Sequence, residues 1–168
     1  MNRLLTLIAT VAVLVPTPVV AKGPTTRIVI TGIRDARTVS LVEPTVLARF
    51  NVWDGPGTFS GPPNQQIEST TGFIADWTGG AIASRPSGLS RFEVQFFVRD
   101  RGTGPERLAY IVLYERDPKT GEGFVYLPGR TDANFQLNAE SIHRGAGYEG
   151  HWFRASAAWQ QATKTLLE

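Results

Sequence analysis

Hydrophobic and polar side chains alternate most clearly in the middle of the chain. Over residues 92–99, aromatic and aliphatic side chains alternate with polar ones, which is the period of a strand with one buried face. Residues 108–114 are apolar at every position, as expected for a central strand that is covered on both faces. Turn residues at 117–121 lead to another apolar run at 124–127. The pattern therefore predicts a three-stranded antiparallel meander over residues 91–127.

Shorter runs of β-branched and aromatic residues flank this meander. Each is bounded by Gly, Pro, Asp or Asn, which favours short strands joined by turns. The strands are expected at residues 27–31, at 38–42, at 72–77, around Phe135 and Leu137, and at 151–154.

Two segments have the spacing of short helices. Residues 44–50 begin with Pro44 in a first-turn position, and residues 157–167 follow Ser156, which can cap a helix. Residues 51–71, by contrast, are rich in Gly and Pro, and we predict a long loop there. The fold class expected from these elements is α+β, mainly β, with an antiparallel sheet and two short helices.

Composition excludes several classes of site. A chain of 168 residues is long enough for a domain with its own core, and we expect a single globular domain over residues 22–168. The absence of Cys excludes thiol nucleophiles, thiolate metal sites and disulfides. The 17 Lys and Arg residues are scattered among 15 Asp and Glu residues, so nucleic acid is not an expected partner. No phosphate-binding loop, dinucleotide-binding loop or nucleophile elbow occurs, and no cofactor is expected.

The N-terminal residues 1–21 have the pattern of a secretory signal peptide. Arg3 precedes a nearly unbroken apolar run over residues 4–15, and small residues lead to a cleavage site after Ala21. The run is shorter than the ~20 residues that a spanning helix needs, and no later segment is longer. We therefore expect an exported protein, periplasmic or secreted, with no transmembrane segment in the mature chain.

Four short stretches carry a resemblance to a known group of proteins. They are Gly-Pro-Thr-Thr-Arg at 23–27, Phe-Asn-Val-Trp-Asp-Gly-Pro-Gly at 50–57, Val-Tyr-Leu-Pro-Gly at 125–129 and Trp-Phe-Arg-Ala-Ser at 152–156. In combination they resemble a family of small exported bacterial proteins that has no assigned activity. The resemblance implies export and a shared fold, and it assigns no catalytic or binding residue.

The first candidate site consists of two Trp–Asp pairs. Trp53 and Asp54 lie at the start of the Gly-rich loop, and Trp77 follows Asp76. An exposed ring beside a carboxylate suits recognition of a sugar or a peptide, without metal. The alternative is that both rings close the ends of the core while the carboxylates make turn hydrogen bonds.

The second candidate site contains both histidines of the chain, His143 and His151, beside Glu140 and Glu149. Such a group could act as base and orienting partner in a hydrolase, or could hold a metal ion. The spacing matches no metal motif, so a solvated polar loop is the alternative.

Arginines at the edges of the predicted elements could bind a carboxylate or phosphate through two N–H donors, but they are interpreted as surface partners of nearby Asp and Glu residues. They are Arg27, Arg49, Arg91, Arg99 and Arg154.

These observations favour a non-catalytic binding or interaction domain of the bacterial envelope. Its expected partner is a glycan, a peptide or another protein of the envelope. The alternative function is a glycan- or peptide-directed hydrolase that uses the two histidines and their neighbouring carboxylates.

Overall fold

The fold is built on a seven-stranded antiparallel sheet with the strand order β2-β1-β6-β7-β8-β9-β5. The structure is a computed structural model that describes residues 23–34, 37–60, 64–99, 104–145 and 147–167. The sheet strands are β1 (Thr25–Gly32), β2 (Thr38–Leu41), β5 (Ala75–Asp76), β6 (Ser90–Arg99), β7 (Glu106–Arg116), β8 (Gly123–Tyr126) and β9 (Trp152–Ala155). A separate two-stranded ladder pairs β3 (Phe59–Ser60) with β4 (Ile67–Glu68). The helices are α1 (Pro44–Leu47), α2 (Phe135–Ser141) and α3 (Ala157–Lys164).

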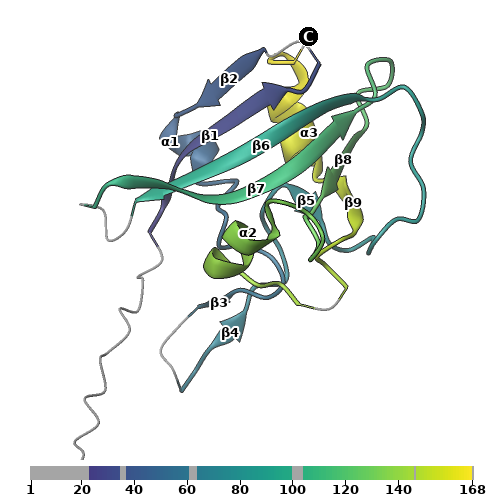
Figure 1. Cartoon of the computed structure of the whole chain (residues 1–168). Helices are drawn as coiled ribbons and strands as arrows, with labels where there is room; N and C mark the ends of the chain where they lie inside the picture. Colours follow the sequence, from purple (N-terminus) through teal and green to yellow (C-terminus); the bar gives the residue numbers. More distant parts are fainter. Residues whose placement is uncertain (1–22, 35–36, 61–63, 100–103, 146, 168) are drawn as a thin grey trace, which may run out of the picture.

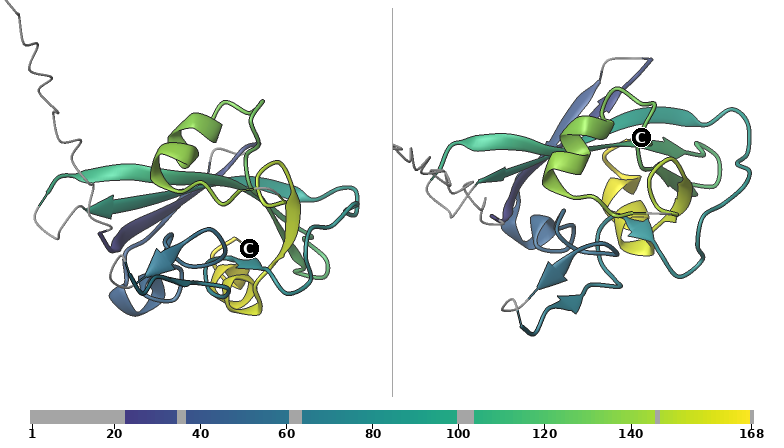
Figure 2. Two further views of the ribbon diagram at one scale, coloured as in Figure 1. Left: turned by 90° about the horizontal axis from the view of Figure 1, so that it is seen from below. Right: turned by 60° about the horizontal axis from the view of Figure 1, so that its bottom comes forward.

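The helices lie on both faces of the sheet (Figures 1 and 2). α2 lies on one face, and α1, α3 and the β3–β4 ladder lie on the other. Alternation along the central strands places every second side chain in the core on the α3 face. These buried side chains are Phe92, Val94 and Phe96 of β6, and Tyr110, Val112 and Tyr114 of β7. Trp159 of α3 is fully buried against them, with its ring 6.0 Å from that of Tyr114.

The strongest sequence patterns are confirmed. β6, β7 and β8 form the predicted antiparallel meander, and β7 lies in the centre of the sheet. β1 pairs with β2 as the two β-branched runs predicted. The final helix begins after Ser156, whose Oγ accepts the N–H of Trp159 over 3.2 Å. The fold class is therefore α+β, mainly β, as expected.

The prediction of a strand around Phe135 and Leu137 is wrong, because these residues lie in α2. Their period-two spacing is too short to define a strand, whereas neighbouring residues are good helix formers. Within the helix, Gln136 donates from Nε2 to Glu140 Oε1 over 3.0 Å, which is the contact expected four residues apart. Asn138, buried in the same helix, points to β7.

Two further segments differ from the expected elements. The strand predicted at 72–77 is reduced to Ala75–Asp76, because Gly72 and Phe73 have positive φ angles of 87° and 70° and cannot extend it. The loop predicted at 51–71 contains the short β3–β4 pair.

The N-terminal signal peptide predicted at residues 1–21 lies outside the described residues. Within the described part of the chain, no helix has the length and apolar character needed to cross a membrane.

Candidate functional site

The Gly-rich loop that begins at residue 51 is held by a buried arginine from a distant part of the chain. Arg144 is 3% exposed, and its guanidinium donates to three backbone carbonyl oxygens. Nη2 reaches Val52 O over 2.9 Å, and Nη1 reaches Asp54 O over 2.9 Å and Pro56 O over 2.8 Å. A guanidinium is the side chain best suited to this task, because it presents several N–H donors in one rigid plane. These bonds fix the backbone at the start of the loop, over residues 52–56.

Aromatic rings surround the same guanidinium. The Arg144 Cζ atom lies 4.9, 5.2 and 5.5 Å from the ring centroids of Phe73, Trp77 and Tyr110. The ring faces attract the cation and replace part of its lost hydration. Gly55 allows the loop to approach this cluster, since a Cβ atom there would lie 2.7 Å from Trp77 Nε1.

Trp53 ties the loop to the beginning of β1. Its indole N–H donates to Gly23 O over 2.5 Å. Thr25 reinforces the connection, because its hydroxyl accepts the N–H of Val52 over 3.2 Å and donates to Asn51 Oδ1 over 3.3 Å. The ring of Trp53 is half-buried and packs against the core. These contacts give Trp53 a structural role, and direct ligand binding by its ring stays a prediction.

Trp77 and Asp76 lie together at a separate pocket of about 360 Å³. The Trp77 N–H donates to Gly72 O over 2.8 Å, so this donor is already used within the protein. Asp76 Oδ1 accepts the N–H and the hydroxyl of Thr78, and these bonds lower the pKa of the Asp76 carboxyl. Ser156 adds a hydroxyl to the pocket lining. Ligand binding at this second Trp–Asp pair also stays a prediction.

Asp54 does not itself line the Trp77 pocket, but it packs against Gly72, which does. Burial raises the pKa of its carboxyl, while the charge of Arg144 and a hydrogen bond with Asn51 act in the opposite direction. The Asp54 side chain packs closely against Gly72: a Cβ atom added to Gly72 would lie 2.6 Å from Asp54 Cβ. The two predicted Trp–Asp pairs therefore lie in different environments.

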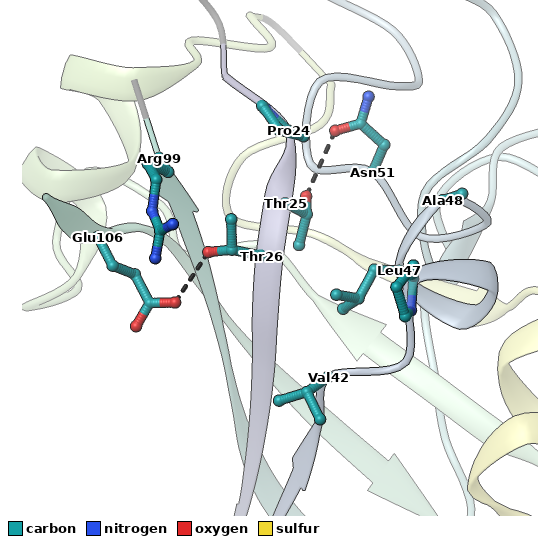
Figure 3. A pocket seen from close by; sticks show the side chains of 10 residues that line it. Pro24, Thr25, Thr26, Val42, Leu47, Ala48, Asn51, Arg99 and Glu106 are labelled. Atoms are coloured by element: carbon teal, nitrogen blue, oxygen red, sulfur yellow. Dashed lines mark hydrogen bonds between the residues drawn. The ribbon is translucent and has the colours of Figure 1, made fainter. Parts of the chain in front are cut away.

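A pocket with a volume of about 660 Å³ lies at the start of β1. Figure 3 shows β1 running through it, with Val42, Leu47 and Asn51 on one side and Thr26 and Glu106 on the other. The side towards α1 is apolar, because Val42, Leu47 and their neighbours Pro44 and Ala48 line it. This volume lies in the ~300–1,000 Å³ range typical of small-ligand sites. We call it the β1 pocket.

The other side of the β1 pocket is charged and hydrogen-bonded. Glu106 Oε2 accepts from Arg27 Nε over 3.0 Å and Nη2 over 2.5 Å, and Oε1 accepts from the Thr26 hydroxyl over 2.8 Å. The bonds from Arg27 hold the pKa of the Glu106 carboxyl below its usual value. Arg99 also lines the pocket; its charge contributes to lowering the pKa of the Glu106 carboxyl, but its guanidinium makes no hydrogen bond with the described residues. The pocket thus combines an apolar wall with an available cation.

Backbone groups also line the β1 pocket. β1 begins at Thr25, but its pairing with β2 begins only at Ile28, opposite Leu41. Within the described residues, no strand therefore covers the outer edge of residues 25–27. A strand edge without a pairing strand offers main-chain donors and acceptors to an added strand.

The histidine segment does not form a compact catalytic group. His143 Nδ1 lies 3.7 Å from Glu149 Oε1, and the same oxygen accepts the backbone N–H of Arg144. Glu140 is paired with Gln136, and His151 is exposed. Among the residues that the structure describes, no three His, Asp or Glu side chains form a group that could hold a metal ion. The hydrolase alternative gains no support from this arrangement.

Most residues of the β1 pocket were not predicted from the sequence. Asn51 belongs to the Gly-rich loop and Thr25 to the first of the four recognised stretches, so both lay in segments that had been singled out. Of the edge arginines, Arg27, Arg91 and Arg154 pair with Glu106, Glu115 and Glu122, as interpreted. Arg144 was missed, because a lone arginine beside two glycines gives no periodic pattern.

Comparison with known proteins assigns no family and no function to the chain. No family model, no curated protein and no solved structure matches the chain. The resemblance to small exported bacterial proteins stays a prediction.

Proposed function

We propose that this chain is a non-catalytic binding domain of the bacterial envelope that holds an extended peptide segment in the β1 pocket. One observation carries the proposal: the edge of residues 25–27, which no described strand pairs with, lies beside an apolar wall in a pocket of about 660 Å³. An extended peptide can satisfy the strand edge with its main chain and the apolar wall with a side chain.

The chemistry of the lining favours a peptide over a glycan. Among the described residues no aromatic side chain lines the β1 pocket, so the flat face of a sugar ring finds no stacking partner there. Val42, which is 55% exposed, and Leu47 provide a surface for an aliphatic or aromatic side chain. Arg99 provides a cation for an acidic side chain or a terminal carboxylate. The expected ligand is therefore an extended peptide with an apolar residue and an acidic group.

Export is the second part of the proposal and depends on residues 1–21. Their pattern supports secretion, and a peptide-binding domain outside the cytoplasm would meet its ligand in the envelope. The mass of the protein recovered from a bacterial periplasmic extract tests this part. A mature N-terminus at Lys22 supports export, and an uncleaved cytoplasmic chain contradicts it.

The binding proposal is tested with a peptide selected from a random library on the immobilised protein. Its affinity is measured by fluorescence anisotropy for the wild type, Val42→Glu and Ile67→Glu. Both substitutions place a charge on an exposed aliphatic position, but Ile67, 72% exposed, lies on β4, outside the pocket. We expect Val42→Glu to weaken binding at least about tenfold, because an unpaired charge would enter the apolar wall. Equal effects of the two substitutions would contradict the proposal.

A further inference from the structure

Another pocket, with a polar lining, lies at the far end of β1, β6 and β7, the strands whose other ends border the β1 pocket. β6 runs from Ser90 to Arg99 and pairs with β7 so that Arg99 faces Glu106 at one end and Ser90 faces Arg116 at the other. The β1 pocket occupies the first end, and a pocket of about 370 Å³ occupies the second. Its polar lining residues are Arg34, Arg85, Ser87, Arg91 and Glu115.

Glu115 organises two of the three arginines. Its side chain is 6% exposed, and each carboxylate oxygen accepts from a different arginine. Arg85 Nε donates to Oε2 over 2.7 Å, while Arg91 donates to Oε1 from Nε over 2.7 Å and from Nη2 over 2.5 Å. A buried carboxylate that is bonded in this way fixes both guanidinium groups in place.

A stacking contact fixes Arg85 further. Its Cζ atom lies 3.5 Å from the ring centroid of Trp152, and the Trp152 ring in turn packs 5.0 Å from the ring of Tyr126. The guanidinium of Arg85 is therefore held between a carboxylate and an aromatic face. Its geometry is set before any ligand arrives.

The pocket keeps an excess of positive charge and of donors. Three arginines line it against one glutamate. Arg34 is exposed and has no hydrogen-bond or ion-pair partner among the described residues. Arg85 uses only Nε and Arg91 only Nε and Nη2 on Glu115, and each guanidinium has five N–H donors. Several fixed donors thus remain for an anion.

We propose that this pocket binds a phosphate group, either as free inorganic phosphate or as the phosphomonoester of a larger molecule. A phosphate monoester carries about −1.5 to −2 charges at pH 7, which matches the two positive charges that Glu115 leaves uncompensated. Arginines bind such a group through paired N–H donors, and the hydroxyl of Ser87 at the pocket adds a further donor. This proposal does not depend on peptide binding at the β1 pocket.

Inorganic phosphate is the first probe, added at constant ionic strength with chloride as the balancing anion. Two-dimensional amide NMR of the full chain is expected to show shifts at Arg34 and over residues 85–91. Arg34→Gln removes an exposed, unpaired cation and should weaken phosphate binding at least about threefold. Arg49→Gln also removes one charge, but Arg49 follows α1 and does not line this pocket, so the variant should leave the phosphate affinity unchanged.

Vesicles distinguish the two sources of the phosphate group. Sedimentation with phosphatidylcholine vesicles that contain phosphatidic acid, lost in Arg34→Gln, would identify a lipid headgroup. Binding of free phosphate without sedimentation would identify a soluble ligand. The proposal is overturned if phosphate causes no local shifts and the vesicles do not sediment the protein, or if Arg34→Gln and Arg49→Gln weaken binding equally.

Discussion

The indole N–H of Trp53 donates to the carbonyl oxygen of Gly23 over 2.5 Å, and this bond joins the Gly-rich loop to the chain just before β1. Two bonds of the Thr25 hydroxyl, with Val52 and Asn51, lie next to it. Thr25 and Asn51 also line the β1 pocket, so the position of the loop determines part of the pocket lining.

Trp53→Phe tests this role, because it keeps an aromatic ring and removes the N–H donor. We expect the free energy of unfolding to fall by about 1 kcal/mol, the usual net value of one hydrogen bond. The selected peptide should also bind more weakly, since Pro24 and Thr25, which line the pocket next to Gly23, are less firmly held. Urea denaturation and fluorescence anisotropy measure the two effects.

Trp77→Phe is the matched control, because it removes a similar bond from Nε1 to Gly72 O at 2.8 Å. It should lower stability by a comparable amount and leave peptide affinity unchanged, since Trp77 does not line the β1 pocket. If only Trp77→Phe weakens binding, the ligand site is the pocket beside Asp76.

Arg144→Met should be among the most destabilising substitutions. It leaves the buried carbonyl oxygens of Val52, Asp54 and Pro56 without their donor, at a cost of at least about 3 kcal/mol in unfolding free energy. The exposed Arg130→Met should change stability by less than about 0.5 kcal/mol. Chemical denaturation compares the two, and a small effect at Arg144 would show that the loop does not depend on it.

Asn138 takes the place of a neighbouring strand along β7. Its Oδ1 accepts the N–H of Ile111 and its Nδ2 donates to Ile111 O, both over 2.7 Å, where β8 no longer pairs with β7. Asn138→Asp keeps the acceptor but places a carboxylate against the Ile111 carbonyl oxygen. We expect a loss of about 2–4 kcal/mol at pH 7 that shrinks in acid, because a protonated carboxyl can again donate.

Asn138→Leu is the comparison for the pH effect. It removes both bonds at every pH, so its stability loss relative to the wild type should not shrink in acid. Unfolding in urea at about pH 4 and about pH 7 separates the two variants. Parallel behaviour would contradict the role given to the Asn138 amide.

Because burial raises the pKa of the Asp54 carboxyl, this residue should make the free energy of unfolding fall as the pH rises. Below its ordinary pKa of 3.8 the carboxyl is protonated in both the folded and unfolded states. As pH rises through the raised folded-state pKa, ionisation favours the unfolded chain and stability is lost. Asp54→Asn should therefore gain stability relative to the wild type between about pH 3 and pH 7. Urea unfolding across this range measures the difference.

Asp117→Asn gives the opposite sign and serves as the control. Hydrogen bonds from the backbone N–H groups of Lys119 and Thr120 lower the pKa of Asp117. Its stabilising contribution is present above the ordinary pKa and is lost as pH falls through the folded-state value. The variant should lose stability relative to the wild type as pH rises from 3 to 7, and equal trends in both variants would contradict the burial argument.

The strands of the sheet could be predicted where apolar and polar residues alternate along the chain. Phe92, Val94 and Phe96 alternate with polar residues because one face of β6 is buried, so the meander was visible in the sequence. α2 was not, because its position depends on the contact between Asn138 and Ile111, which are far apart in the chain. Local pattern contains no information about such a pairing.

The candidate site was predictable only in part, for a similar reason. The Gly-rich loop was recognised, and its Asn51 does line the β1 pocket. Val42 follows β2, while Arg99 and Glu106 end β6 and begin β7, and only the register of β2, β1, β6 and β7 brings them together. The buried role of Arg144 likewise follows from tertiary contacts alone.

Mapping the selected peptide onto the protein by two-dimensional amide NMR tests the central claim most directly. Peptide binding at the β1 pocket should shift the amides of residues 25–27 and 42–51, of Arg99 and of Glu106, and Val42→Glu should abolish these shifts at the same peptide concentration. Shifts confined to residues 70–78 around Trp77, or shifts that persist in Val42→Glu, would contradict peptide binding at the start of β1.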